Sequence, residues 1–193
     1  MTMAGGEMMR AFIGLDFDEN VKERIYAFQQ KLKGDALKGR WKSIDNFHLT
    51  LKFLTEIGMA QKAEIDNAMQ KIGVLRTPFY LSVKGLGMFA GKDSIRVLWL
   101  GLMGDMEKLR SLQREIDQQL APVGFLPEKR TFQPHITIGQ DVIFDGGFDQ
   151  IQNRIGTVDF GMMKIKRFYL FKSEQIQNKR VYSKVSEYDF VIK

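Results

Sequence analysis

Apolar and polar residues alternate with a period of two over residues 47–54, which read Phe-His-Leu-Thr-Leu-Lys-Phe-Leu. This pattern predicts a β-strand with one face in the core, because successive side chains of a strand point to opposite sides. His48, Thr50 and Lys52 are then expected on one face. The side chains expected on the core face are Leu49, Leu51 and Phe53.

The same pattern returns over residues 134–139, which read Pro-His-Ile-Thr-Ile-Gly. Here His135 and Thr137 share the polar face, and Ile136 and Ile138 are expected in the core. The chain has only two histidines, and each is followed two residues later by a threonine. The sequence thus places an imidazole beside a hydroxyl twice, which favours a site over two unrelated surface histidines.

Periodicity predicts the remaining elements. Helical spacing of apolar residues predicts helices over 18–33, 60–75, 105–120 and 148–155. Apolar or alternating runs predict strands over 10–17, 79–86, 95–102, 163–171 and 181–191, with a polar turn over 173–180. Residues 1–9 have no periodicity and are expected to be a disordered leader, so that a single domain covers 10–193. Each half of this domain has a helix followed by a His-x-Thr strand, which two related lobes would give.

Composition narrows the class of protein. A hydrophobic content of 44% with 15 phenylalanines indicates a globular protein. No apolar run approaches the roughly 20 residues that span a membrane, and no signal peptide is recognisable, so we expect a cytoplasmic protein. The chain has no cysteine and its two histidines are 87 residues apart, so we expect no metal site. A net charge of +6 favours polyanionic partners such as RNA.

Two imidazoles that face one cleft suit a reaction in which one proton is removed and another delivered, because histidine titrates near neutral pH. Phosphodiester cleavage fits, and the hydroxyls of Thr50 and Thr137 can donate hydrogen bonds to phosphate oxygens. Lys52 either adds a positive charge to this face or is a solvated strand lysine. Motifs for nucleotide-binding P-loops, Ser-hydrolase elbows and zinc proteases are absent from the sequence.

The paired motifs resemble the 2H phosphoesterase superfamily, and their surroundings resemble its RNA 2′,3′-cyclic phosphodiesterase (LigT-like) family. The stretches that carry this resemblance are 10–16, 40–51, 96–101 and 130–137. It implies a bilobal α+β fold in which two antiparallel sheets, flanked by helices, face each other across a central cleft. It also implies an enzyme that opens the terminal 2′,3′-cyclic phosphate of RNA to a 2′-phosphate without a cofactor or metal.

The resemblance also implies roles for individual residues. His135 would activate water, His48 would protonate the departing 3′-oxygen, and the two threonines would hold the phosphate. Arg130 is a substrate-binding candidate, although strict alternation places it opposite His135 unless Pro134 bends the strand. Phe12 is a candidate for stacking on a base, while core packing is the usual place for a phenylalanine. By parity, Phe47 points away from His48.

Two positions depart from the family pattern. Gln133 and Gln140 stand where the family often has arginine, which affects substrate affinity more than reaction class. A binding module without turnover, and a phosphodiesterase for other nucleotides such as 2′,5′-linked oligonucleotides or an ADP-ribose cyclic phosphate, therefore stay open. Joining of RNA ends through a 2′,5′ bond is a further expected side activity, and we expect a monomer. If both histidines act on one phosphate, their rings should lie roughly 5 to 8 Å apart.

Overall fold

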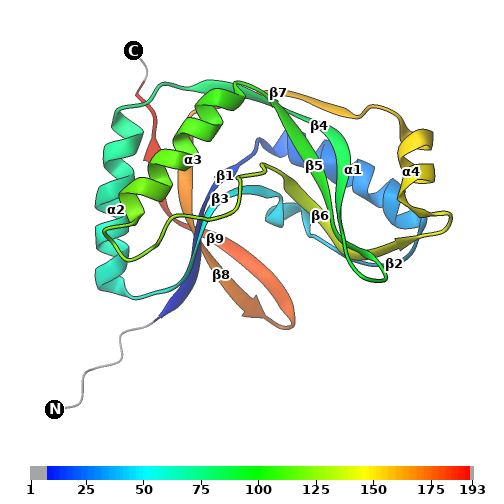
Figure 1. The fold of residues 1–193 in the computed structure, drawn as a ribbon, viewed down its shortest axis with the longest axis horizontal. Helices are drawn as coiled ribbons and strands as arrows, with labels where there is room; N and C mark the ends of the chain where they lie inside the picture. Colours follow the sequence, from blue (N-terminus) through cyan, green and yellow to red (C-terminus); the bar gives the residue numbers. More distant parts are fainter. Residues whose placement is uncertain (1–7, 192–193) are drawn as a thin grey trace.

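The computed structural model describes residues 8–191, and Figure 1 shows its elements in chain order. The strands are β1 (Met9–Asp16), β2 (Ala36–Trp41), β3 (His48–Ile57), β4 (Phe79–Ala90), β5 (Ile95–Gly104), β6 (Ile136–Phe144), β7 (Asp159–Ile165), β8 (Arg167–Ile176) and β9 (Lys179–Asp189). The helices are α1 (Glu19–Gly34), α2 (Met59–Val74), α3 (Met106–Leu120) and α4 (Gly147–Ile155), with a 3-10 helix at Ile44–Asn46. The predicted α+β class is confirmed.

The strands form one antiparallel sheet with the order β7-β4-β5-β6-β3-β1-β8-β9, and β2 pairs with β6 outside this path. Each motif strand pairs with the strand that comes before the preceding helix in the chain. Thus β3 pairs with β1, which precedes α1, and β6 pairs with β5, which precedes α3. The two motif strands pair with each other only at Leu49 and Ile136. The two expected sheets are therefore two halves of one sheet, which meet at a single residue pair and diverge from it (Figure 1).

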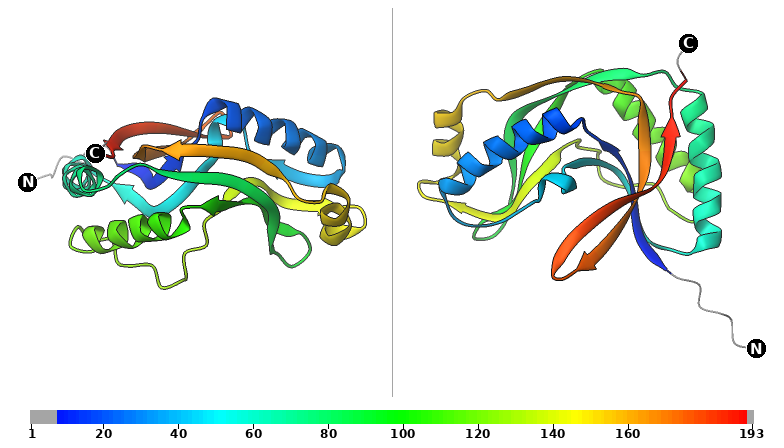
Figure 2. Two further views of the ribbon diagram at one scale, coloured as in Figure 1. Left: turned by 90° about the horizontal axis from the view of Figure 1, so that it is seen from above. Right: turned by 180° about the vertical axis from the view of Figure 1, so that it is seen from behind.

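The helices are divided between the two halves of the sheet (Figures 1 and 2). Helices α2 and α3 pack on each other beside β9 and β3, whereas α1 contacts β2 and β7 and α4 contacts β6. Most residues of the apolar stripes predicted for the helices are buried, as Ile25 in α1, Ile65 in α2 and Ile116 in α3 show with no exposed surface. Ala63 of α2, which was predicted in its stripe, is exposed. Burial of these stripes is the main stabilisation that each helix contributes.

A β-bulge in β3 changes which side chains face the cleft. Thr50 is paired with Gly14 of β1 and Lys52 with the next residue back, Ile13, so Leu51 is an extra residue without a partner. Alternation is reset at this point. Lys52 is 2% exposed on the core side with Ile13, whereas Phe53 is 65% exposed. The predicted faces of Lys52 and Phe53 are thus both wrong, and those of the residues before the bulge are right.

Three further features differ from the sequence predictions: strand β2, the strand expected over 163–171 and the turn expected over 173–180. Strand β2 was not predicted, because it lies at the surface and shows no apolar alternation. The predicted strand 163–171 is two strands, β7 and β8, which separate at Lys166 and join opposite halves of the sheet. The polar turn 173–180 is shorter than predicted, since only Gln177 and Asn178 leave the ladder, both with the positive φ of a type I′ hairpin turn.

The start of the fold lies one residue before its predicted position, because β1 begins at Met9. Met8 precedes the strand, and the rest of the predicted leader lies outside the described residues.

A buried glutamine holds the sheet where β6 changes partner. On one side of β6, Ile136 pairs with β3, and from Gly139 onward the partner is β2. The Gln29 side chain of α1 has no exposed surface, and its amide nitrogen donates to the carbonyl oxygens of Lys42 and Ile138, each at 2.8 Å. Both carbonyl groups lie where the strands part. Gln29 therefore joins α1 to the backbone just before β3 and within β6.

We predict that Gln29→Leu lowers the free energy of unfolding by about 1–3 kcal/mol, because the buried Lys42 carbonyl loses its donor and the Ile138 carbonyl keeps only the Lys42 N–H. Urea denaturation at pH 7 measures this. The matched control is Gln70→Leu on the exposed side of α2, which should stay within about 0.5 kcal/mol of the parent. Equal stability of the two variants would contradict the structural role of Gln29.

Candidate active site

The ring of His48 is fixed at the start of β3 by both of its nitrogens. Nδ1 lies 2.8 Å from the carbonyl oxygen of Asn46, and Nε2 lies 3.0 Å from the Thr50 hydroxyl. A carbonyl oxygen only accepts hydrogen bonds, so Nδ1 carries a proton, and Nε2 of the neutral ring accepts from Thr50. The ring also packs against Phe12, with centroids 4.6 Å apart, and against the edge of Tyr182 at 4.9 Å. The backbone thus selects the tautomer whose Nε2 can take up a proton.

His135 repeats this arrangement at the start of β6. Its Nδ1 lies 2.8 Å from the carbonyl oxygen of Gln133, which is again two residues earlier in the chain. The ring packs edge-on against Phe89, with centroids 5.1 Å apart, and near Trp99 at 6.2 Å. Nε2 of His135 is therefore also the nitrogen available for proton transfer.

The single pair between β3 and β6 brings the two motifs together. When the antiparallel register is continued by one residue in each direction from Leu49 and Ile136, His48 comes opposite Thr137 and Thr50 opposite His135. In such a register the two histidines are diagonal neighbours, whose Cα atoms are about 7–8 Å apart where the strands stay paired. The separation of roughly 5 to 8 Å between the two rings stays a prediction. The positive charge of a protonated His135 also acts on the pKa of His48.

A cavity of about 600 Å³ opens beside this crossing. The motif residues Thr50, His135 and Thr137 line it, and Arg130 lines it as well. Arg130 is exposed and lies in the loop before β6, where the strand alternation does not apply. His48 does not line this cavity and lies behind Thr50, to which it is hydrogen-bonded. The structure thus brings all four motif residues together, with three of them at the cavity surface.

Aromatic side chains that the sequence did not single out also line the cavity. These are Phe53, Phe89 and Phe132. Phe53 was expected in the core, and only the unforeseen bulge at Leu51 brings it here. No short motif marks Phe89 or Phe132, so sequence reasoning had no signal with which to find them. Such faces are suited to stacking on a nucleobase.

Two predicted substrate-binding residues have other partners. The Lys52 ammonium is buried in an ion pair with Asp117 and also donates to the carbonyl oxygen of Leu126 at 2.9 Å. Phe12 is 2% exposed, and its ring supports His48 instead of offering a face to a base. Lys52 lines the cavity, but its ammonium is already neutralised by Asp117, and the Phe12 ring is covered by its aromatic neighbours, so direct substrate contact stays a prediction for both. Arg130 remains a candidate for that role.

The pKa values of both imidazoles are lowered, which keeps them neutral at pH 7. Burial, with repulsion from Lys42 and His135, lowers the pKa of His48 to about 4, although the Asn46 carbonyl and Asp16 act in the opposite direction. Burial also lowers the pKa of His135, against the effect of the Gln133 carbonyl. An anion bound between the rings would raise both values, because it stabilises the protonated forms.

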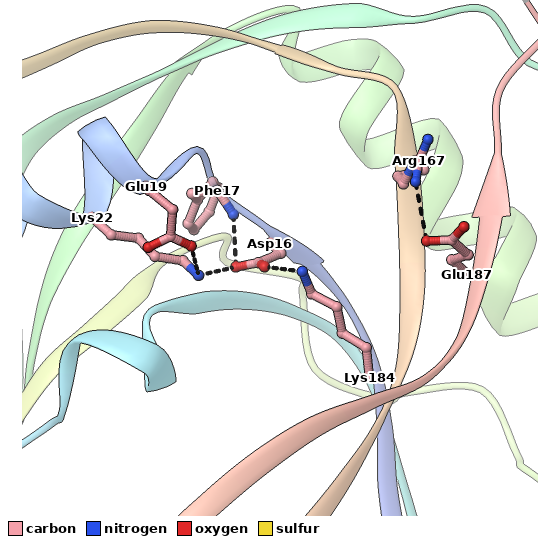
Figure 3. A network of polar contacts seen from close by, with 7 residues as sticks. All are labelled: Asp16, Phe17, Glu19, Lys22, Arg167, Lys184 and Glu187. Atoms are coloured by element: carbon pink, nitrogen blue, oxygen red, sulfur yellow. Dashed lines mark hydrogen bonds and ion pairs between the residues drawn. The ribbon is translucent and has the colours of Figure 1, made fainter.

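Asp16 is the carboxylate next to His48 in the sheet, and it is held by two lysines (Figure 3). Lys22 of α1 lies 2.7 Å from one of its oxygens and Lys184 of β9 contacts the other. Burial alone would raise the pKa of Asp16, but hydrogen bonds from Lys184 and Lys22 and the charge of Lys22 outweigh it and lower this pKa. Asp16 therefore joins β1, α1 and β9 as a neutralised anion and leaves little negative charge to hold a proton on His48.

Residues 8–191 contain neither a metal site nor a membrane-spanning helix. No group of three or more His, Cys, Asp or Glu side chains is arranged to hold a metal ion. Every helix in this part of the chain is too short or too polar to span a bilayer.

The antiparallel sheet brings two His-x-Thr strands together beside one cavity, an arrangement that suits phosphoester chemistry. A family model described as LigT like Phosphoesterase matches residues 15–99 and again residues 100–182, so the chain belongs to this family. Each of the two matches contains one His-x-Thr motif, which agrees with the predicted internal symmetry.

Individual relatives span nearly the whole chain. The chain is 34% identical to an RNA 2′,3′-cyclic phosphodiesterase of Methanocaldococcus jannaschii over 183 residues, which cover 93% of this chain and all of that protein. It is 32% identical to the protein of the same name from Thermotoga maritima, with 94% and 96% covered. The structure of E. coli LigT complexed with 3′-AMP superimposes with a TM-score of 0.80 at 24% identity and covers 96% of this chain and all of that one.

We predict that His48 makes the protein less stable as pH falls. Its pKa is about 4 in the folded state and near 6.5 when unfolded, so between these values the unfolded state binds the proton and the folded state does not. Stability is therefore lost as pH falls from about 6.5 and levels off below about 4. His48→Gln removes this contribution, so its loss of stability from pH 7 to pH 5 should be smaller than the parent's by about 1–2 kcal/mol. Urea denaturation at both pH values measures this, and identical losses would contradict the lowered pKa.

Proposed function

We propose that this protein hydrolyses the 2′,3′-cyclic phosphate at RNA 3′ ends to a 2′-phosphomonoester, with His48 and His135 as the acid and base. The observation that carries this proposal is the antiparallel pairing of Leu49 with Ile136, which sets the two His-x-Thr motifs beside each other on one face. Family membership and relatives named RNA 2′,3′-cyclic phosphodiesterase support the hydrolysis of a cyclic phosphodiester. E. coli LigT in complexes with 3′-AMP and NADP+ supports a nucleotide as the bound group.

In the proposed reaction a water oxygen attacks phosphorus and the bond from phosphorus to the 3′-oxygen breaks. His135 Nε2 takes the proton from the water, and His48 Nε2 gives a proton to the departing 3′-oxygen. The backbone carbonyls of Asn46 and Gln133 favour this use of Nε2 on both rings, since each holds a proton on Nδ1. Proton transfer of this kind needs one neutral and one protonated ring before the attack.

In this scheme the hydrogen-bond acceptor of the Thr50 hydroxyl changes with the protonation state of His48. In the neutral site it donates to His48 Nε2. Once His48 is protonated, Nε2 becomes a donor and no longer accepts this hydrogen bond. The Thr50 hydroxyl is then free to donate to a non-bridging phosphate oxygen, as is that of Thr137, where charge accumulates in the transition state. Arg130 at the cavity wall supplies a positive charge for the same anion.

Three earlier expectations stay predictions. They are a monomeric state, a cytoplasmic location and 2′,5′ RNA ligation as a side activity. The lack of arginine at Gln133 and Gln140 motivated two alternatives, a binding module without turnover and an enzyme for other nucleotides. The activity assays described next distinguish both from the proposed function.

We predict that His48→Ala and His135→Ala each lower kcat/KM for a 2′,3′-cyclic mononucleotide by at least about 100-fold, because each removes a general acid or base. The assay is run in EDTA, and the position of the product phosphate is read by phosphorus NMR. Thr157→Ala, an exposed threonine outside the site, is the control and should match the parent. Thermal melts confirm that the variants are folded.

Undiminished turnover in either histidine variant would overturn the two-histidine mechanism. Binding of the nucleotide by the parent without hydrolysis would favour the binding module instead. A much higher rate on a 2′,5′-linked oligonucleotide than on the cyclic phosphate would favour the other phosphodiesterase.

We further predict a bell-shaped pH dependence of kcat/KM with its maximum below pH 6.5. This parameter reports the free enzyme, in which the pKa values of both histidines are lowered, so the form with one neutral and one protonated ring is most abundant between these lowered values. The maximum of kcat should lie at higher pH, because the bound phosphate raises both pKa values. A flat profile from pH 5 to 8, or coincident maxima, would contradict this.

A further inference from the structure

A second cavity, of about 620 Å³, lies between α1, β2 and the tip of the β8–β9 hairpin. We call it the hairpin groove. Five of the residues that line it are cationic, and none is acidic. The cationic residues are Lys33, Arg40, Lys42, Lys179 and Arg180. Its size is in the range of pockets that hold a small-molecule-sized ligand, and its charge selects an anion.

Most of this positive charge is not neutralised by the protein. Arg40 is the lining cation with an acidic partner, Asp141, whose carboxylate lies 2.5 Å from Nη2. Lys33 and Lys179 are exposed and form no ion pair within residues 8–191. The Lys42 ammonium donates to the Gln140 side chain at 3.0 Å, and burial together with repulsion from Arg40 and Arg180 lowers its pKa. An anion in the groove would relieve this repulsion.

The hairpin groove adjoins the active site. Asn46 and Tyr182 line the groove, and both contact His48, through the carbonyl hydrogen bond and the edge of the tyrosine ring. Gln140 lines the groove and also the cavity that contains His135. A molecule with its reacting phosphate between the two histidines can therefore extend past His48 and Gln140 into the groove.

We infer that the hairpin groove binds the sugar-phosphate backbone of single-stranded RNA on the 5′ side of the terminal cyclic phosphate. This inference rests on the proposed function and adds to it a preference for oligonucleotides over mononucleotides. Any RNA longer than one nucleotide carries a phosphodiester directly upstream of its last nucleoside, which is the anion that the groove would meet. Tyr26, which is 41% exposed, and Trp41 also line the groove and offer rings to the bases.

The test compares two substrates, a 2′,3′-cyclic mononucleotide and an eight-nucleotide RNA with the same cyclic end. Lys33→Gln/Lys179→Gln should raise KM for the RNA about tenfold and leave kinetics on the mononucleotide unchanged. Binding of an unreactive eight-nucleotide RNA is then measured by fluorescence anisotropy at several salt concentrations. The slope of log K against log salt concentration should become smaller in magnitude by about 1.4 in this variant, since each phosphate contact on a single strand contributes about 0.7.

The control variant is Lys31→Gln/Lys71→Gln, which removes the same net charge. Lys31 is exposed on α1 but lies two residues from Lys33, on nearly the opposite side of the helix, and Lys71 is exposed on α2. This control should retain the parental RNA kinetics and salt slope. An equal effect of both double variants, or none from the groove variant, overturns the inference.

The binding assay keeps the two proposals separate. If the parent hydrolyses neither substrate, the proposed function fails, while the salt slope still decides whether the groove binds RNA. If the parent hydrolyses both substrates with equal kcat/KM and the groove variant behaves like the parent, the function stands and the groove inference fails.

Discussion

The active site depends on one backbone pairing, between Leu49 of β3 and Ile136 of β6. Each of these residues follows a histidine and precedes a threonine, so a single antiparallel pair suffices to place both motifs on the same face. Because the pairing does not continue, the two halves of the sheet diverge (Figure 1). The cavity of about 600 Å³ lies on the face that carries Thr50, His135 and Thr137. A longer ladder would fix the histidines equally well and would close this space.

The sequence predicts the site residues better than their surroundings, for a physical reason. Period two requires only local backbone regularity, and it holds for His48 and Thr50 as it does for His135 and Thr137. It fails one residue later, since a bulge at Leu51 is set by the pairing with β1 and leaves no mark in the alternation. Lys52 and Phe53 therefore exchange faces. In the same way, β2 and the separation of β7 from β8 follow from tertiary pairing, which local patterns do not encode.

The surroundings of the histidines explain why two imidazoles of one type can have different roles. Both imidazole rings pack against aromatic side chains. His48 is in addition close to Lys42, and the carboxylate next to it, Asp16, is already neutralised by Lys22 and Lys184. The pKa of His48 is therefore lowered to about 4, and the free enzyme carries little protonated His48 at pH 7. A phosphate anion between the rings raises the pKa of His48, because it stabilises the protonated ring. In the proposed mechanism, binding of the anionic substrate would therefore supply the acid.

Gln140 and Lys42 show how this chain can keep positive charge where the family pattern suggests arginine. The Gln140 side chain of β6 accepts a hydrogen bond from the Lys42 ammonium, which lies just beyond β2. A cation therefore stands beside position 140, but it belongs to the segment that leads into the first motif and lines the hairpin groove. From there it acts on His48 as well as on an anion in the groove. An arginine at position 140 would need no such partner. Under the inference above, Lys42 would be the residue through which an anion in the groove also acts on the pKa of His48.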